Sequence, residues 1–306
     1  MRTLGGYLKK LRDNIKEQRG VFILFTLLRL MVIAALIRSL MLHHYEGAAT
    51  CILVLVLFFL PSFLEDKLKL RIPALFEGII YCFIFAAEIL GELDHFYTQI
   101  PIWDTMLHTL NGFLFAAVGF STVDLLNRTN KNFSLTPLYL TMVAFCFSMT
   151  IGVLWEFFEC GADLFLGQDM QKDFIIGSFQ SVTLDPTHSQ QVIAVEDVTS
   201  TLIQTGSGDS FLVEGGYLDI GILDTMKDLF VNFIGALVFC SFGFAYLKYG
   251  ESKKIASTVV SGLRLQPAEE EATEEATEEV KEEITAETTA ETTAETAAAT
   301  EAETKQ

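Results

Sequence analysis

The chain has 306 residues, of which 51% are hydrophobic and 26 are phenylalanine, a composition typical of membrane proteins rather than of soluble domains. Its formal net charge is −18, but residues 266–306 hold fourteen Glu and two Lys and so contribute −12 of that total. The rest holds no basic patch of the kind that binds nucleic acid, which excludes a nucleic-acid partner. The five cysteines lie in or beside apolar runs without a C-x-x-C pair, so they predict neither disulfides nor a zinc knuckle.

Six apolar stretches are each long enough to cross a hydrocarbon core, which needs about 20 helical residues. They cover residues 21–42, 47–64, 73–93, 104–126, 137–160 and 225–247. The first is too long for a signal peptide and is interrupted by Arg29, so we expect an uncleaved span and 21–164 as the first five helices. The sequence thus predicts an all-α polytopic membrane protein with six transmembrane helices.

Lysine and arginine residues predict the orientation of these helices. Fifteen of them lie in residues 1–20, 65–71, 127–132 and 248–264, whereas the opposite side has only Arg38, Lys172 and Lys227. Because short cytoplasmic loops are enriched in Lys and Arg, both termini are expected in the cytoplasm, with 1–20 a basic cytoplasmic segment. Arg29 and Glu77 both fall near the cytoplasmic face, which predicts a structural ion pair.

Two segments outside the spans have their own character. Residues 165–224 contain two β-rich runs around the turn G-S-G-D at 206–209, which predicts a hairpin in a small external β-rich insert between helices five and six. Residues 248–306 are expected to be a cytoplasmic tail. From about residue 265 its acidic Glu/Thr/Ala repeats are too polar to fold into a core, so we expect disorder there.

Polar side chains recur at helical spacing near the outer ends of four spans, where residues three, four or seven apart share one helix face. The rows are Asp104, His108 and Asn111 in the fourth span, Glu156, Glu159 and Asp163 in the fifth, and Asp224, Asp228 and Asn232 in the sixth. The third span ends with Glu88, Glu92 and Asp94, of which the first two lie one turn apart. The expected topology brings all four groups to one membrane face. The acids of the fifth span should form the rim of an external pocket at the interface, since residues 137–155 already cover about 28 Å, and His108, Asn111 and Asn232 should lie deeper.

Several of these residues have plainer interpretations. Asp104 and Asp224 stand where helices begin and suit N-caps, Asn111 and Asn232 suit interhelical hydrogen bonds, and Trp103 and Trp155 suit an aromatic belt at the interface. As a group, however, the carboxylates would repel one another. They must be neutralised by protons, as in a proton relay, or by a cation, unless they serve only as structural contacts. Carboxylates with one imidazole suit Mg²⁺, Mn²⁺, Ca²⁺ or Zn²⁺, and a divalent cation is our leading interpretation.

Three short motifs resemble those of one family. Asp104, His108 and Gly112 fit D-x-x-x-H-x-x-x-G, Trp155, Glu156 and Glu159 fit W-E-x-x-E, and Asp224 and Asp228 fit D-T-x-x-D. In these residues the chain resembles the YjdF-like multi-pass membrane proteins, and its His-bearing helix is also similar to VanZ-like proteins. The resemblance implies a location in the bacterial cytoplasmic (inner) membrane, but no particular reaction or substrate.

Three hypotheses for the function follow. The first is a metal-dependent hydrolase or transferase acting on a lipid or external substrate, because a bound cation acidifies water and polarises phosphoryl or acyl oxygens. In that hypothesis the residues divide by role into metal ligands (His108, Glu156, Glu159 and Asp228), catalytic residues (Asp104 and Asp163) and substrate-binding residues (Glu92, Asn111, Asp224 and Asn232). The second is an ion- or proton-coupled transporter, for which a homodimer would supply enough spans. The third is a non-catalytic sensor or assembly factor in which the insert binds a partner.

Overall fold

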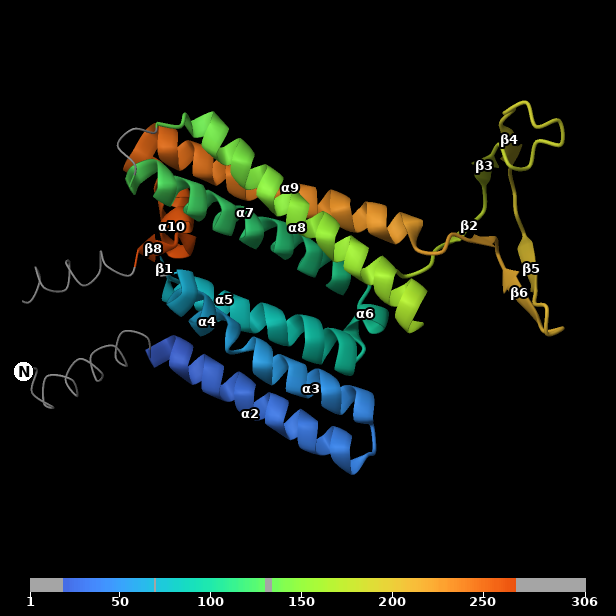
Figure 1. Ribbon diagram of the computed structural model, residues 1–306, viewed down its shortest axis with the longest axis horizontal. Coiled ribbons are helices and arrows are strands. Elements are labelled where there is room, and N and C mark those ends of the chain that lie inside the picture. The colour runs from blue at the N-terminus through green and yellow to red at the C-terminus, as the bar shows by residue number, and fades with distance from the viewer. Residues whose placement is uncertain (1–18, 69, 130–133, 268–306) are drawn as a thin grey trace, which may run out of the picture. The chain divides into compact units, whose positions relative to one another are not determined.

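The computed structural model describes residues 19–68, 70–129 and 134–267, so most of the predicted basic N-terminus and acidic tail lie outside the described residues. Among the described residues, six helices are long and apolar enough to cross a membrane, which confirms the predicted six-span helical class (Figure 1). Many of their large apolar side chains are exposed, among them Leu30, Phe157 and Phe230, as expected for surfaces that face lipid. The described residues divide into two compact units, 19–84 with 262–267 and 85–261.

The first unit contains α2 (Arg19–Met41), α3 (Tyr45–Leu57), α4 (Leu60–Leu68) and α5 (Ala74–Ile84). The helices α3 and α4 together form the second span, interrupted at 58–59. The rings of Phe25, Phe58 and Tyr81 join these helices, with centroids 4.9 to 5.9 Å apart. Arg29 lies over the rings of Phe25 and Phe59, while Glu77 accepts a hydrogen bond from Tyr81. Among the described residues no ion pair joins Arg29 to Glu77, so the predicted pair is not formed, and each residue contacts aromatic side chains instead.

The start of the predicted tail is folded. After α9 (Ile222–Tyr249) and the 3₁₀ turn η2 (Gly250–Ser252), residues Lys254–Leu263 form the helix α10, which buries Ala256, Val260 and Leu263. The strand β8 (Gln266–Pro267) then pairs antiparallel with β1 (Leu70–Arg71) in the first unit. Apolar residues at positions 256, 260 and 263 share one helix face, so this segment folds for the usual amphipathic reason.

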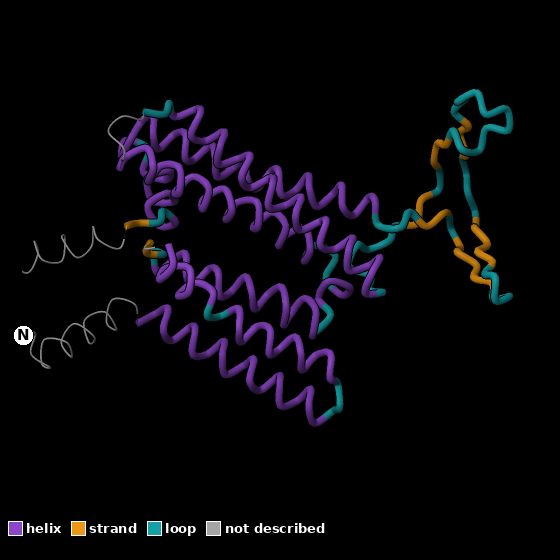
Figure 2. The backbone as a smooth tube through the Cα atoms, in the orientation of Figure 1, coloured by secondary structure: helices purple, strands orange, loops and turns teal. Residues whose placement is uncertain are grey.

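The second unit is built on α7 (Trp103–Thr129), α8 (Pro137–Leu166) and α9, which pack against one another pairwise (Figure 2). Before α7, the chain runs through the π-helical segment η1 (Phe85–Leu93) and the short helix α6 (Phe96–Gln99). Thr136 caps α8 by accepting a hydrogen bond from the amide of Tyr139, and α8 ends at Gly167, whose φ of 65° is left-handed. These caps fix both ends of the helix that carries Glu156 and Glu159.

Residues 167–221 join α8 to α9 and contain three antiparallel strand pairs, which confirms the predicted β-rich insert between helices five and six (Figure 2). The pairs are β2 (Ile175–Ile176) with β7 (Tyr217–Leu218), β3 (Phe179–Ser181) with β4 (Ile193–Val195), and β5 (Ser200–Gln204) with β6 (Ser210–Glu214). The hairpin β5–β6 turns at 205–209, where the sequence predicted it. Its register pairs Leu202 with Leu212.

Candidate metal centre

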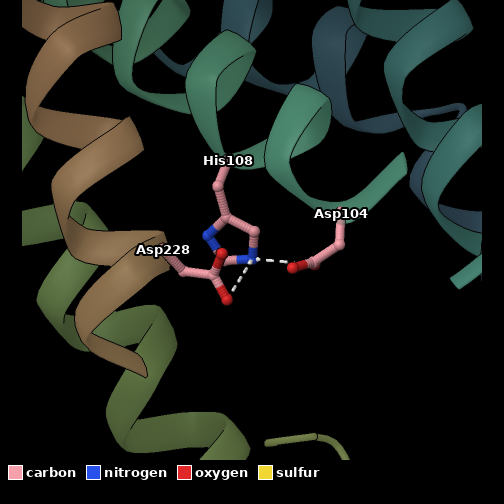
Figure 3. Close-up of side chains that lie close together, drawn as sticks. All are labelled: Asp104, His108 and Asp228. Carbon is pink, nitrogen blue, oxygen red and sulfur yellow. Dashed lines mark ion pairs between the residues drawn. The ribbon is translucent and has the colours of Figure 1, made fainter. Parts of the chain in front are cut away.

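His108 lies at the centre of a polar cluster near the start of α7. Its Nε2 atom is 3.4 Å from Asp104 Oδ1, one helical turn earlier, and 4.0 Å from Asp228 Oδ2 on α9 (Figure 3). Its Nδ1 atom is 3.7 Å from Glu156 Oε1 on α8. His108 is 8% exposed. Both nitrogens of one buried imidazole therefore face carboxylates, supplied by three helices.

Glu156 and Glu159 on α8 lie beside His108. Glu156 and Glu159 are 4% and 8% exposed, so both are buried. Trp155 donates a hydrogen bond from Nε1 to Glu159 Oε1 at 2.8 Å, which holds one oxygen of that carboxylate and leaves the other free. Where α7 and α8 meet, His108 and Glu156 lie side by side, a contact that depth measured along α8 alone could not predict. The position of these acids relative to the membrane interface stays a prediction.

Lys227 on α9 is a member of the cluster that the sequence analysis missed. Its Nζ atom lies 2.7 Å from Asp224 Oδ1, 3.3 Å from Asp104 Oδ2 and 3.6 Å from Asp228 Oδ1. The segment D-T-M-K-D already offered the signal, since Asp224 and Lys227 are three residues apart on one helix. Lys227 was instead counted only as a charge on the outer side.

Three buried side-chain oxygens among the described residues have no hydrogen-bond partner, and two of them belong to the cluster. These are Glu156 Oε2 and Asp228 Oδ1; the third is Ser121 Oγ. Buried carboxylate oxygens without a donor are costly, and each such atom calls for an explanation such as a bound ion. The cluster therefore has acceptor capacity that its own side chains do not use.

Two overlapping groups in the described chain could hold a metal ion. One is Asp104, His108 and Asp228; the other is His108, Glu156 and Glu159. In each group the candidate ligand atoms lie within 4.8 Å of one another. Both use His108, whose imidazole offers one nitrogen to each group. Oxygen ligands with one imidazole nitrogen suit Mg²⁺, Mn²⁺ or Zn²⁺.

The two asparagines hold the helices together beneath the cluster. Asn111 Nδ2 donates to Asn232 Oδ1 at 3.1 Å, and Asn232 Nδ2 lies 3.5 Å from Met149 Sδ on α8. A Cβ atom on Gly152 would lie 2.6 Å from Asn232 Nδ2, so α8 has no room for a side chain there. Asn232 is 1% exposed and joins α7, α8 and α9, which agrees with the interhelical alternative for both asparagines.

The first residues of the insert are hydrogen-bonded to the cluster-bearing helices. Asp224 Oδ2 accepts from the amide of Lys172 at 3.0 Å, and Gln171 Nε2 donates to Thr225 Oγ1. Asp224 is not the N-cap of α9, because the cap position is Gly221 and the amide of Leu223 donates to Asp219. The alternative of Asp224 as an N-cap is therefore wrong, whereas its carboxylate does face the cluster.

Two residues of the predicted site lie apart from His108. Both oxygens of Asp163 accept backbone amides, from Met170 at 2.6 Å and Gln171 at 2.9 Å, so this acid closes the turn after α8. Glu92 is exposed on η1 and belongs to neither metal-holding group. Asp163 fell outside the cluster because a seven-residue offset from Glu156 keeps the helix face but moves the side chain about 10 Å along it.

Tyr97 is a further neighbour that the sequence analysis did not single out. It lies on α6, where its ring occupies the space that a Cβ atom on Gly91 would need. Burial, followed by the nearby charges of Asp104 and Glu88, raises the pKa of the Tyr97 phenol. The hydroxyl is therefore protonated at neutral pH and able to donate a hydrogen bond.

Together, the fold and the cluster define a polytopic membrane protein with a buried His/Asp/Glu group able to hold a metal ion. Residues 24–183, just over half of the chain, match the profile of a family described as predicted membrane protein, DUF2238. The chain belongs to this family, which includes the YjdF-like proteins. No curated protein and no solved structure matches it. The matched segment contains Asp104, His108, Glu156 and Glu159 and ends before α9.

Proposed function

We propose that the chain is a metal-dependent membrane hydrolase or transferase whose divalent cation binds to His108, Glu156 and Glu159. The observation that carries this proposal is Glu156 Oε2, a buried oxygen without a hydrogen-bond partner on a carboxylate that faces His108 Nδ1. The oxygen of Glu159 that Trp155 does not hold is available as well. Three ligands from the protein leave open positions on a cation for water and substrate, as catalytic sites require.

The position of Lys227 favours one of the two candidate metal-binding groups over the other. Its ammonium already lies within 3.6 Å of an oxygen of both Asp104 and Asp228 on the Nε2 side of His108. No cationic side chain is recorded beside Glu156 or Glu159, among the described residues, except His108 itself. The divalent cation is therefore assigned to the Nδ1 side. Asp228, the fourth ligand expected from the sequence, then faces His108 Nε2 and Lys227 instead.

The surrounding residues have roles around this centre. Asp104 accepts a hydrogen bond from His108 Nε2, and this contact orients the ring with Nδ1 toward the ligand position. Carboxylates commonly orient metal-binding histidines in this way. A bound cation would acidify a water molecule and polarise a phosphoryl or acyl oxygen. Asp104 is 23% exposed and is the carboxylate of this group best placed to exchange a proton with solvent. Asp224, Asn111 and Asn232 support the helices around the substrate.

The location of the site defines the kind of substrate. The Lys and Arg distribution supports a bacterial inner-membrane protein with both termini in the cytoplasm. The cluster lies at the ends of α7, α8 and α9 that adjoin the insert, which is then the external side. A substrate at this depth would be a lipid headgroup or an external molecule at the membrane surface.

A non-catalytic sensor is the second candidate, favoured by the hydrogen bonds of Gln171 and Lys172 to Thr225 and Asp224. Through them, cation binding would change the position of the insert. A transporter has less support within the second unit. On α7, the buried residues between Asn111 and Ser121 are Gly112, Leu114, Ala116, Ala117, Gly119 and Phe120, which offer no polar side chain to an ion.

Metal content tests the proposal. The full chain, purified in detergent, should carry a stoichiometric divalent cation that His108→Ala and Glu156→Gln remove. Trp155→Phe, which deletes only the hydrogen bond to Glu159, should weaken binding by roughly 10–100-fold. Glu46→Gln, an exposed acid on α3, is the matched control and should bind as the wild type does. Absence of metal, together with a thermal stability that neither EDTA nor Mn²⁺ changes, would exclude the enzyme and leave the transporter.

A further inference from the structure

Lys227 is held in an arrangement usually found around a bound cation. Its Nζ atom faces one oxygen from each of Asp104, Asp224 and Asp228, at 3.3, 2.7 and 3.6 Å. The ammonium donates hydrogen bonds to Asp104 and Asp224, whereas Asp228 Oδ1 lies at ion-pair distance without a hydrogen bond, so one of its three N–H donors is not committed to a carboxylate. The carboxylates of Asp224 and Asp228 are 6% and 2% exposed, so two of the three are removed from water.

The oxygens that face Lys227 are distinct from those that face His108. Asp104 directs Oδ1 to His108 and Oδ2 to Lys227. Asp228 directs Oδ2 to His108 and Oδ1 to Lys227, and this Oδ1 atom has no hydrogen-bond partner. Asp224 gives Oδ1 to Lys227 and Oδ2 to the amide of Lys172. The three oxygens around Nζ thus form a separate position beside the ligands on the Nδ1 side.

We propose that Lys227 occupies a second cation position, formed by Asp104, Asp224 and Asp228, and thereby restricts the centre to one divalent ion. The inference rests on the function proposed above. Carboxylate oxygens are the ligands that hard divalent cations prefer. Without the ammonium, three buried or partly buried carboxylates would repel one another at close range, and a divalent cation is the simplest replacement. A centre with one exchangeable ion and one fixed ammonium would hold an anionic substrate group between two positive charges.

The test is Mn²⁺ binding by the full chain in detergent after removal of metal with EDTA. Wild type should bind one ion, Lys227→Met two, and Lys227→Arg, which keeps the charge, one. If Lys227→Met does not fold, Lys227→Met with Asp224→Asn lowers the repulsion and retains Asp104, His108 and Asp228, which can hold an ion together. Glu46→Gln is again the control.

A second set of variants tests this inference independently of the proposed function. Glu156→Gln with Glu159→Gln should bind no Mn²⁺, and adding Lys227→Met to it should restore one ion. One ion in both wild type and Lys227→Met, with both folded, would overturn the second position and leave the proposed function intact. No ion in wild type but one in Lys227→Met would overturn the proposed function and support the second position.

Discussion

At the residue scale, Asp219 connects the insert to α9. Its Oδ1 atom accepts the amides of Phe174 at 2.7 Å and Gly221 at 3.2 Å, and its Oδ2 atom accepts the amide of Leu223 at 2.9 Å. The next residue, Ile220, has a φ of 55°, which is unfavourable for a β-branched side chain. The carboxylate therefore holds a strained turn next to the cluster-bearing end of α9.

Protonation of Asp219 should loosen this turn. Burial alone would raise the pKa of the carboxyl, but the backbone hydrogen bonds from Phe174, Leu223 and Gly221 lower it below its ordinary value. Because the folded pKa lies below the unfolded one, the stabilisation is complete above about pH 4 and is lost as the pH falls through the folded pKa. Hydrogen-exchange protection of residues 172–176 and 217–223, corrected for the intrinsic pH dependence of exchange, should fall over that interval.

The Asp219→Asn variant should show the same loss at neutral pH. The amide leaves one buried donor without an acceptor, at a cost of roughly 1–3 kcal/mol, and its protection should no longer depend on pH. Glu196→Gln, an exposed acid in the same insert, serves as the control. Equal protection in wild type and Asp219→Asn at pH 7 would contradict the structural role of this carboxylate.

At the element scale, the packing of α7 against α9 depends on glycines where the backbones touch. A Cβ atom on Gly235 would lie 1.9 Å from the carbonyl oxygen of Thr109, which cannot move without the helix. On Gly161 of α8, by contrast, an added Cβ atom meets nothing within 4 Å. Small residues that allow close backbone approach are typical of helix contacts in membranes.

Gly235→Ala should therefore destabilise the second unit by about 2 kcal/mol or more, since overpacking forces backbone shifts. Gly161→Ala is the matched variant and should be neutral or stabilising by up to about 1 kcal/mol, because alanine favours the helix. Thermal unfolding in detergent compares the two. Because Thr109 adjoins His108, Gly235→Ala should also weaken Mn²⁺ binding. Equal behaviour of both alanine variants would disprove the close contact.

Sequence periodicity predicted much of each helix but little of how the helices meet. The four-residue spacing of Asp104 and His108 placed them correctly on one face of α7, and apolar length predicted the six spans. The rotation of each helix about its axis depends on packing at contacts such as Gly235 with Thr109. It could therefore not be deduced from the sequence which carboxylate oxygens face each nitrogen of His108. Lys227 was missed for a related reason. A count of charges predicts on which side of the membrane a lysine lies, but not which carboxylates it contacts.

At the scale of the whole molecule, the Lys and Arg distribution predicts on which side of the membrane the cluster lies. The insert joins α8 and α9 at their cluster-bearing ends, as Lys172 shows by donating its amide to Asp224. An external insert would therefore place the candidate metal centre at the external face. An internal insert would place the same centre in contact with cytoplasmic substrates.

An epitope inserted between Gly206 and Ser207, where an added atom at Gly206 meets nothing within 4 Å, should be accessible to antibody in intact spheroplasts. An epitope after Gln306 should become accessible only after permeabilisation, since the distribution of Lys and Arg predicts both termini in the cytoplasm. A tag placed between Asp209 and Ser210, in the same turn, controls for local damage to the hairpin. Labelling of the C-terminal tag alone in intact cells would reverse the topology and place the substrate inside, while leaving the ligand assignment to be judged by metal content.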